Sequence, residues 1–415
     1  MPGVLEATAL PGGLAGRYVE LGLRLGRHVE GMVDAYYGPE ALERRVKAEP
    51  LARPVRLVAD ARALRAGLDG GEPLDSDARG RPQSASSAGL RRRRWLRAQA
   101  LGLLTTAQVL AGEHVGYADE VEACYGVRPR RVPEDAFAEA HAALDKVVPG
   151  SGPLAERFMA WREAQAVPPG VLEAAIASLA EDLRERTEAL FGLPEGEQVA
   201  FELVTKRPWA GFNYYLGGLR SRVAVNVDLP VLSTSLAHLV AHEAYPGHHT
   251  EHCRKEVGLV RRRGQVEEAI FLVGTPQCLM AEGLADLGLE VVMGRRPEES
   301  VAAHLRPLGI GYDPEVVAAV SEAAETLGAA RANAAFRLHE DGADPEVVVD
   351  ELARWALLPR ARAAKALEFL SDPTWRAYVT CYVEGLPLCR RWVGASPERF
   401  GRLITEQLVP ADLAS

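Results

Sequence analysis

The sequence predicts a mainly α-helical protein with one small antiparallel β-sheet. Apolar residues recur at helical spacing over most of the chain, whereas only two short segments near its middle alternate apolar and polar residues as strands do. Aromatic residues make up only 6% of the chain, so the core must consist largely of Leu, Val and Ala. That composition suits packed helices better than sheets.

Residues 1–195 are predicted to form an N-terminal helical region. The segment 13–46 has helical spacing, with Pro39 as a turn or a new start. The stretch 69–87 is polar and rich in Gly, Pro and Ser, and we expect a loop there that forms either a lid or a surface excursion. The other helices expected in this region cover residues 55–68, 90–112, 133–147, 154–165 and 171–191.

Residues 196–415 are predicted to form the second region, and the two regions could make one compact unit. Alternating segments at 199–204 and 222–231 indicate two strands of an antiparallel sheet, joined by a segment rich in glycine and aromatic residues. From Ser233 to the C-terminus the pattern is helical again.

Composition and charge exclude several classes of protein. The net charge of −9 makes a nucleic-acid-binding surface an unfavourable interpretation. The most apolar long segment, 269–294, is interrupted by residues such as Pro276 and Glu282, so we expect a buried helix and no membrane span. Five widely spaced cysteines without a CxxC pair, and an N-terminus without a basic and apolar leader pattern, predict a cytoplasmic protein.

Histidines are concentrated in one short segment. The chain has 10 histidines, and five of them lie in a single stretch: His238, His242, His248, His249 and His252. A lone histidine is more often a core or surface residue than a ligand, but such clustering favours a metal site.

The spacing within this cluster requires a break in the helix. Zinc proteases with HExxH place two imidazoles one helical turn apart on the same face. Here His242 and Glu243 are followed by Pro246, and in an unbroken helix His248 would point roughly 120° away from His242. The step from Pro246 to Gly247 is therefore predicted to end or kink the helix, so that His248 faces His242.

Two residues compete for the position of third ligand. His252 lies one turn after His248, so a site of three histidines is possible. Glu282 lies in an apolar helix, where a carboxylate is costly to bury unless it is paired or bound to a metal. We favour Glu282, because His252 lies in the polar run 250–256 that is typical of a solvated helix.

The motif HEAYPGH, followed by EGLA, resembles the bacterial family named domain of unknown function 885, which carries HExxPGH and a downstream EGWA. The resemblance extends to the stretches 117–129 and 208–230 and to the C-terminal segment that begins at Tyr382. That family is similar to the zincin metallopeptidases, in which a helical body surrounds a short sheet and an active-site helix. The resemblance implies zinc bound by His242, His248 and Glu282, with Glu243 as the catalytic base. Leu284 stands where the family usually has Trp.

The predicted function is that of a zinc-dependent hydrolase, most simply a metallopeptidase. A zinc-activated water would attack a peptide or small amide, and Glu243 would act as general base. Tyr382 is the preferred donor to the developing oxyanion, because the family resemblance includes its segment, with Tyr378 and Tyr245 as weaker candidates. The strand that begins at residue 222 could offer an edge to an extended peptide. The residues expected to line that cleft are Asn213, Tyr214 and Arg220.

Two alternatives remain open from the sequence. A zinc amidase acting on a small non-peptide substrate would use the same metal chemistry. A non-catalytic helical protein with structural zinc would close all four positions with Cys and His, and Cys253 beside His252 makes this conceivable.

Overall fold

The computed structural model describes residues 12–75, 87–207 and 209–414. Its N-terminal half is a series of helices that confirms the predicted order, with boundaries shifted by one to three residues in most of them. These helices are α1 (Gly13–Leu25), α2 (Glu40–Ala48), α3 (Pro54–Asp69), α4 (Ser87–Leu110), α5 (Tyr117–Tyr125), α6 (Glu134–Val147), α7 (Leu154–Ala164) and α8 (Pro169–Phe191). Most of the predicted loop at 69–87 lies outside the described residues.

The C-terminal half is also helical after a short group of strands. Its helices are α9 (Ser233–Glu243), α10 (His248–Lys255), α11 (Pro276–Met293), α12 (Glu298–Leu305), α13 (Pro314–Ala324), α14 (Ala330–His339), α15 (Pro345–Trp355), α16 (Arg360–Ser371), α17 (Val379–Val393), α18 (Pro397–Leu403) and α19 (Pro410–Leu413). A π-helical turn, Glu256–Arg261, continues α10. The predicted mainly helical class with a small sheet is confirmed.

The helical prediction for 13–46 is wrong in its middle, whereas the new start at Pro39 is confirmed, since Pro39 is the N-cap of α2. Helix α1 ends at Leu25, before Gly26, and β1 (Val33–Tyr36) precedes α2. This strand pairs antiparallel with β5 (Ile270–Leu272), which occupies the first part of the segment predicted as the long apolar helix. Two such short strands exist only because tertiary contact brings distant segments together, and local periodicity does not reveal them.

The three-stranded sheet has a different topology from the one expected. Its order is β2 (Gln198–Val204), β4 (Arg220–Asn226), β3 (Gly211–Tyr215), with β4 in the centre. The segment predicted as a connection is β3, which pairs antiparallel with β4. Because β3 reverses the chain once more, β2 and β4 are parallel, and the antiparallel pairing expected between these two segments is wrong.

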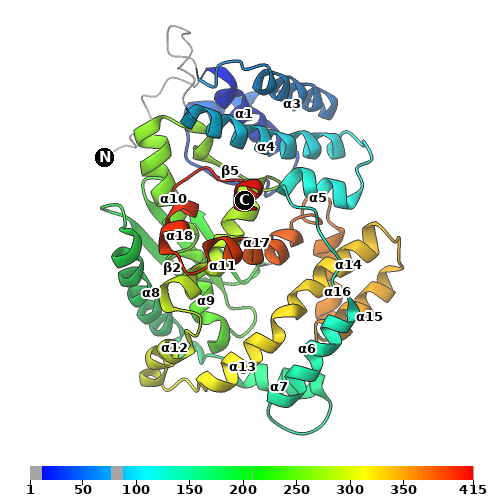
Figure 1. Ribbon diagram of the computed structural model, residues 1–415, viewed down its shortest axis with the longest axis vertical. Helices are drawn as coiled ribbons and strands as arrows, with labels where there is room; N and C mark the ends of the chain where they lie inside the picture. Colours follow the sequence, from blue (N-terminus) through cyan, green and yellow to red (C-terminus); the bar gives the residue numbers. More distant parts are fainter. Residues whose placement is uncertain (1–11, 76–86, 208, 415) are drawn as a thin grey trace.

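Helix α11 occupies the middle of the molecule, between α9 and α17 (Figure 1). Helices α1, α3 and α4 form one hydrophobic core with β5, and α8, α9 and β4 form a second. The largest core includes α11 and α17 together with α5 and α6. These cores contain residues from both sides of position 195, so the division into two regions stays a prediction.

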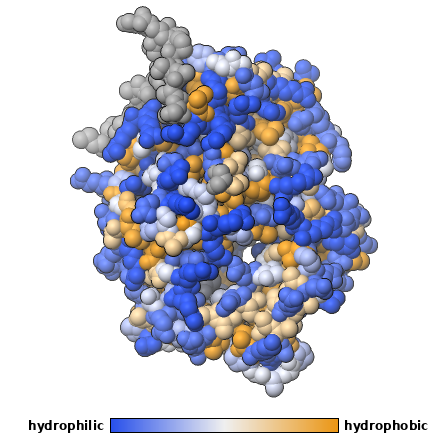
Figure 2. Space-filling view, in the orientation of Figure 1, coloured by the Kyte–Doolittle hydropathy of each residue, from blue (hydrophilic) through white to orange (hydrophobic). Residues whose placement is uncertain are grey.

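The described chain contains no helix long and apolar enough to cross a bilayer. The face seen in Figure 2 is mostly hydrophilic, with hydrophobic residues scattered over it. All five cysteines are free and buried. Cys253 lies on α10, Cys278 on α11, and Cys381 and Cys389 on α17.

Candidate metal centre

Helix α9 ends at its His-Glu pair, as the sequence predicts. The chain leaves the helix at Ala244, whose φ and ψ are −125° and −79°, and α10 begins at His248. At Gly247 a Cβ atom would lie 1.9 Å from the carbonyl oxygen of His242, so only glycine fits there. The predicted break at the Pro246–Gly247 step is confirmed.

The break brings the two histidines face to face. The Nε2 atoms of His242 and His248 are 3.1 Å apart. Glu282, from α11, places Oε2 3.6 Å from Nε2 of His242 and Oε1 3.5 Å from Nε2 of His248. Ligand atoms around a tetrahedral zinc with bonds of about 2.0–2.1 Å are separated by about 3.4 Å, so the spacing suits one zinc ion.

The polar atoms of this group also fit a metal chemically. Glu282 is only 6% exposed, and its Oε2 atom is buried without a hydrogen-bond partner in the described chain. Burial alone would raise the pKa of Glu282, but the hydrogen bond and charge of His248, with the charge of His242, lower it. A buried carboxylate beside two imidazoles is a donor set that zinc uses in catalytic sites.

Glu282 is positioned by a close approach of two helices. Gly283 of α11 faces Gly385 of α17, and a Cβ atom on Gly283 would lie 2.4 Å from the carbonyl oxygen of Gly385. Glycine therefore sits in both the EGLA and the YVEG segments because the helix backbones nearly touch. The contact brings Tyr378 to the site, where its hydroxyl donates to Oε1 of Glu282 at 2.9 Å.

Tyr382, the preferred oxyanion donor, lies one helical turn beyond Tyr378. Its ring packs edge-on against that of Tyr378, with centroids 5.2 Å apart, and the residue is 47% exposed. Its catalytic role stays a prediction. The hydroxyl of Tyr245 donates to Glu197 instead, in a buried position, so Tyr245 is not available as a donor to substrate.

Glu243 follows His242 directly and is buried beside the group. Burial raises the pKa of Glu243, against the opposing charges of His242 and His248. Strand β3 covers it, because a Cβ atom on Gly211 would lie 3.1 Å from Oε1 of Glu243. Asn213, on the same face of β3, donates to the backbone carbonyl of Glu243 at 2.5 Å.

This arrangement corrects the expected substrate edge. The strand that begins near residue 222 is β4, which is paired on both sides, and the edge strand beside Glu243 is β3. Asn213 faces the motif, whereas Tyr214 alternates to the other face and packs under the guanidinium of Arg222 at 4.4 Å. Arg220 is exposed at the start of β4.

The polar run after His248 is not a solvated helix. His249, Glu251 and His252 of α10 are buried, because the helix lies between the sheet and other helices. The ring of His252 stacks on Tyr215 with centroids 4.6 Å apart and contacts Phe271. Burial lowers the pKa of His252. Two groups of the described chain have ligand atoms close enough to hold a metal ion, and neither includes His252: His242, His248 and Glu282 form one, and His238, His242 and Asp286 form the other.

Two acidic residues near the site were missed as functional candidates. Asp286, one turn after Glu282, accepts from Nδ1 of His242 at 2.9 Å and lies 3.4 Å from Nε2 of His238. Burial would lower the pKa of His242, but Asp286 and Glu282 raise it to about 10. The sequence did contain a signal for Asp286, because it is a second acid in the same apolar segment as Glu282 and would be equally costly to bury without a partner.

Asp34, on β1, is the other missed acid. Burial, with the charges of Glu282 and Glu243, raises the pKa of Asp34 to about 7, against the charge of His248. Its side chain forms no hydrogen bond or ion pair with the rest of the described chain. Asp34 lies beside the site because β1 pairs with β5, and no local sequence pattern predicts this pairing.

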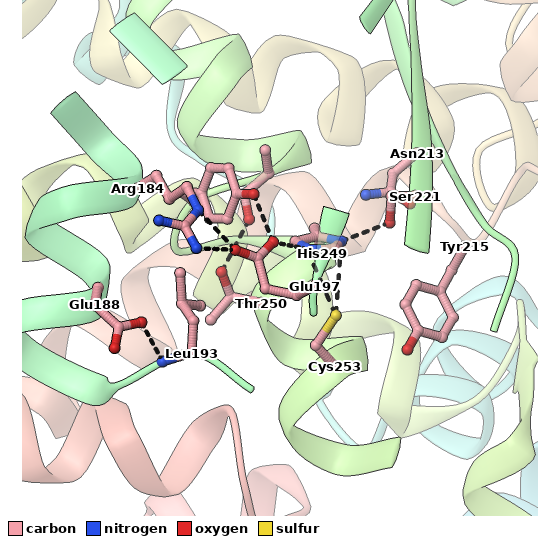
Figure 3. Close-up of polar contacts among 12 residues, drawn as sticks. Arg184, Glu188, Leu193, Glu197, Asn213, Tyr215, Ser221, His249, Thr250 and Cys253 are labelled. Atoms are coloured by element: carbon pink, nitrogen blue, oxygen red, sulfur yellow. Dashed lines mark hydrogen bonds and ion pairs between the residues drawn. The ribbon is translucent and has the colours of Figure 1, made fainter. Parts of the chain in front are cut away.

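Figure 3 shows a second polar cluster, around His249, which follows His248 directly in the sequence. Nε2 of His249 donates to Oε2 of Glu197 at 2.9 Å, and Nδ1 lies 2.8 Å from Oγ of Ser221. A serine, a histidine and an acid also form hydrolase triads, but all three residues are buried here. The ring nitrogens are also used in reverse, since in a triad Nε2 faces the serine. The cluster is therefore structural.

Two further acids, Glu267 and Glu268, are buried in another part of the core. Glu267 accepts from Nε of Arg92 at 2.5 Å and from Gln407 at 3.0 Å. Burial raises the pKa of Glu268 to about 7. Their side chains point inward because the segment 266–272 runs through the core next to α1 and α4.

Comparison with known proteins gives only distant matches. No family model and no curated protein matches the chain. Among solved structures, a provisionally named lipoprotein from Colwellia psychrerythraea is 13% identical with a TM-score of 0.48, and the match covers 86% of this chain and 65% of that one. A provisionally named lipoprotein of unknown function from Shewanella oneidensis is 13% identical with a TM-score of 0.44, over 97% and 72% of the two chains.

An M32 carboxypeptidase from Deinococcus radiodurans R1 is 13% identical with a TM-score of 0.39, over 96% of this chain and 92% of that one. This chain spans 65% of the length of the Colwellia protein. At these values the matches describe a distant likeness of chain trace. The function therefore has to be inferred from the site residues themselves.

Proposed function

We propose that the protein is a zinc-dependent hydrolase, and specifically a metallopeptidase that cleaves peptide bonds. One observation carries the proposal: two imidazole nitrogens and one carboxylate converge at the spacing of zinc ligands, while Glu243 lies next to them without being one of them. His242, His248 and Glu282 would hold the metal and leave a fourth position open.

Bound zinc would supply Lewis acidity and lower the pKa of a water molecule at the site towards about 7. Glu243 would accept the proton of the attacking water and pass it to the leaving nitrogen. Burial raises the pKa of Glu243, and a more basic carboxylate accepts the proton of water more readily. The hydrogen bond from Asn213 to the backbone carbonyl of Glu243 holds β3 beside this residue, and Gly211 leaves room for its carboxylate.

A donor is also needed for the oxygen on which negative charge develops. Tyr382 is our candidate, because it is partly exposed on the α17 face that borders Glu282. Tyr378 is already engaged with Glu282 and would serve mainly to orient that carboxylate.

An extended peptide is the substrate that the surroundings favour. Strand β3 is an edge strand beside Glu243, so its free side could pair with a peptide as an added strand. A zinc amidase for a small non-peptide substrate would use the same metal residues but would not need this edge. A structural zinc has less support, because Cys253 contacts His249, whose ring is bonded to Glu197, and His252 is stacked on Tyr215.

The test combines metal analysis with a mixed peptide library. The purified chain is expected to contain about one zinc per molecule and to cleave peptides. A chelator should abolish cleavage and added zinc should restore it. Cleavage only of small amides would favour the amidase. Firmly held zinc without turnover on either substrate class would contradict the proposal and favour structural zinc.

A further inference from the structure

A single buried carboxylate contacts both sides of the turn that carries His248. Glu197 immediately precedes β2, and its Oε2 atom accepts from the hydroxyl of Tyr245 at 2.7 Å and from Nε2 of His249 at 2.9 Å. The residues between Tyr245 and His249 are those of the helix break, with His248 as the last of them. One oxygen atom therefore bridges the two ends of the turn.

The carboxylate is itself fixed from a third direction. Nε and Nη2 of Arg184, on α8, lie 2.7 and 2.6 Å from Oε1 of Glu197. Figure 3 shows Glu197 between Arg184 and His249, with Ser221 of β4 on the far side of the imidazole. Helix α8 and strands β2 and β4 are thus all connected to the turn by charged or neutral hydrogen bonds.

The turn needs such an anchor because it is not held as a regular helix. Two of its backbone bonds, Gly247 N–H to Ala241 O at 2.9 Å and Thr250 N–H to Ala244 O at 3.2 Å, reach back six residues instead of the four of an α-helix, and Glu251 N–H donates to Gly247 O at 3.0 Å. Rotation of the turn would move His248 away from His242, while the metal tolerates only small changes in ligand position. Burial makes the anchor strong, since hydrogen bonds to a charged group in a low-dielectric interior exceed neutral ones.

We propose that Glu197 is a positioning residue that holds the Tyr245–His249 turn so that His248 faces His242. This inference rests on the proposed function only in taking His248 as a metal ligand. Glu197 touches neither the ligand atoms nor the place of a substrate, and it acts on the site through Tyr245 and His249.

The experiment compares two buried carboxylates of similar environment. Glu197→Gln removes the charge that bonds Arg184, Tyr245 and His249. Glu267→Gln is the matched control, because Glu267 is likewise buried and accepts from Arg92 and Gln407, in another hydrophobic core. Tyr245→Phe removes only one of the bonds to Glu197 and keeps the ring, so it tests the same anchor without loss of a charge.

Two readouts are measured on each variant: the zinc dissociation constant by competition with a chromogenic chelator, and hydrogen exchange of the metal-free protein. Changes in residues that orient metal ligands cost roughly 10–100-fold in affinity. We expect Glu197→Gln to weaken zinc binding by at least about tenfold. Tyr245→Phe should also weaken zinc binding, but by a smaller factor. Exchange of the amides of Gly247, Thr250 and Glu251 should accelerate in both. Glu267→Gln should leave zinc binding within about twofold and accelerate exchange around its own core.

The positioning role would be overturned if Glu197→Gln and Tyr245→Phe both bound zinc as tightly as the unaltered protein and showed its rate of hydrogen exchange in the turn. If Glu197→Gln does not fold, Tyr245→Phe decides by the same two readouts. If the unaltered protein binds no zinc, the proposed function fails, and exchange of the turn alone then decides whether Glu197 anchors it.

Discussion

His248 and His249 are neighbours in the sequence but belong to two clusters with opposite properties. On one side, His248 and His242 point ring nitrogens at each other across 3.1 Å, and the nearby Oε2 of Glu282 is buried without a hydrogen-bond partner among the described residues. On the other side, His249 lies between Glu197 and Ser221 with both nitrogens bonded. Buried polar groups in folded proteins are normally paired. The cluster around His248, which contains an unpaired buried oxygen, is the candidate site. The cluster around His249, whose polar groups are paired, holds the turn that carries His248.

The largest effect is expected when a proposed metal ligand is replaced. Glu282→Gln should weaken zinc binding by more than about 100-fold, beyond the range for residues that merely orient a ligand. His252→Gln, on the same helix as His248, should change zinc affinity only a few-fold, since His252 is stacked on Tyr215. Zinc affinity measured by chelator competition decides, and the reverse ranking would favour the site of three histidines.

Glu243→Gln separates the acid beside the metal ligands from the ligands themselves. The zinc content is expected to stay near one per molecule, while peptide hydrolysis falls by about 10² or more, as for a lost general base. Turnover with the most readily cleaved library peptide is the measurement. Near-normal turnover would remove Glu243 from the mechanism.

The hydrogen bonds of Glu197 should make the stability of the fold depend on pH. Burial would raise the pKa of Glu197, but its bonds to His249, Tyr245 and Arg184 lower it to about 2, from an ordinary value of 4.5. A depressed carboxyl pKa stabilises the fold above the ordinary value, and this contribution is lost as pH falls towards 2. The shift corresponds to about 3 kcal/mol.

Urea unfolding of the metal-free protein should therefore show a gap of this order between the unaltered chain and Glu197→Gln at neutral pH. The gap is expected to narrow as pH falls from about 4.5 to about 2. A gap that is constant down to pH 3 would mean that Glu197 has no preference for ionisation in the folded state.

The smallest effect is expected at the carboxylate behind His242. Asp286→Asn keeps the volume but weakens the acceptor for Nδ1 of His242, and should reduce zinc affinity by about 10–100-fold. His238→Gln is the control, because His238 is half-exposed and its contact with Asp286, at 3.4 Å, is longer than that of His242. Equal effects of the two changes would show that Asp286 does not orient His242.

The sequence predicted the features that depend on local chemistry. Proline followed by glycine at 246 and 247 disfavours a continuous helix, so the approach of His248 to His242 followed from the printed residues. The choice of Glu282 as a candidate followed from the apolar residues on either side of it. Helix boundaries were close for the same reason.

What could not be predicted depends on contacts between distant segments. The pairing of β1 with β5 joins residues more than 230 positions apart in sequence and places Asp34 near the site. The bond between His249 and Glu197 spans 52 positions, and the burial of α10 depends on both the sheet and β5. A polar run such as 250–256 looks solvated until its partners are known.

The buried cysteines provide a way to follow motion around the site. Cys253, Cys278 and Cys381 lie on α10, α11 and α17, the helices that carry His248, Glu282 and Tyr382. Burial raises the pKa of each of these thiols, so an alkylating reagent meets neither an accessible sulfur nor a thiolate in the closed state. The alkylation rate of each cysteine, resolved by peptide mass, would therefore measure how often its own helix opens, without any label being introduced.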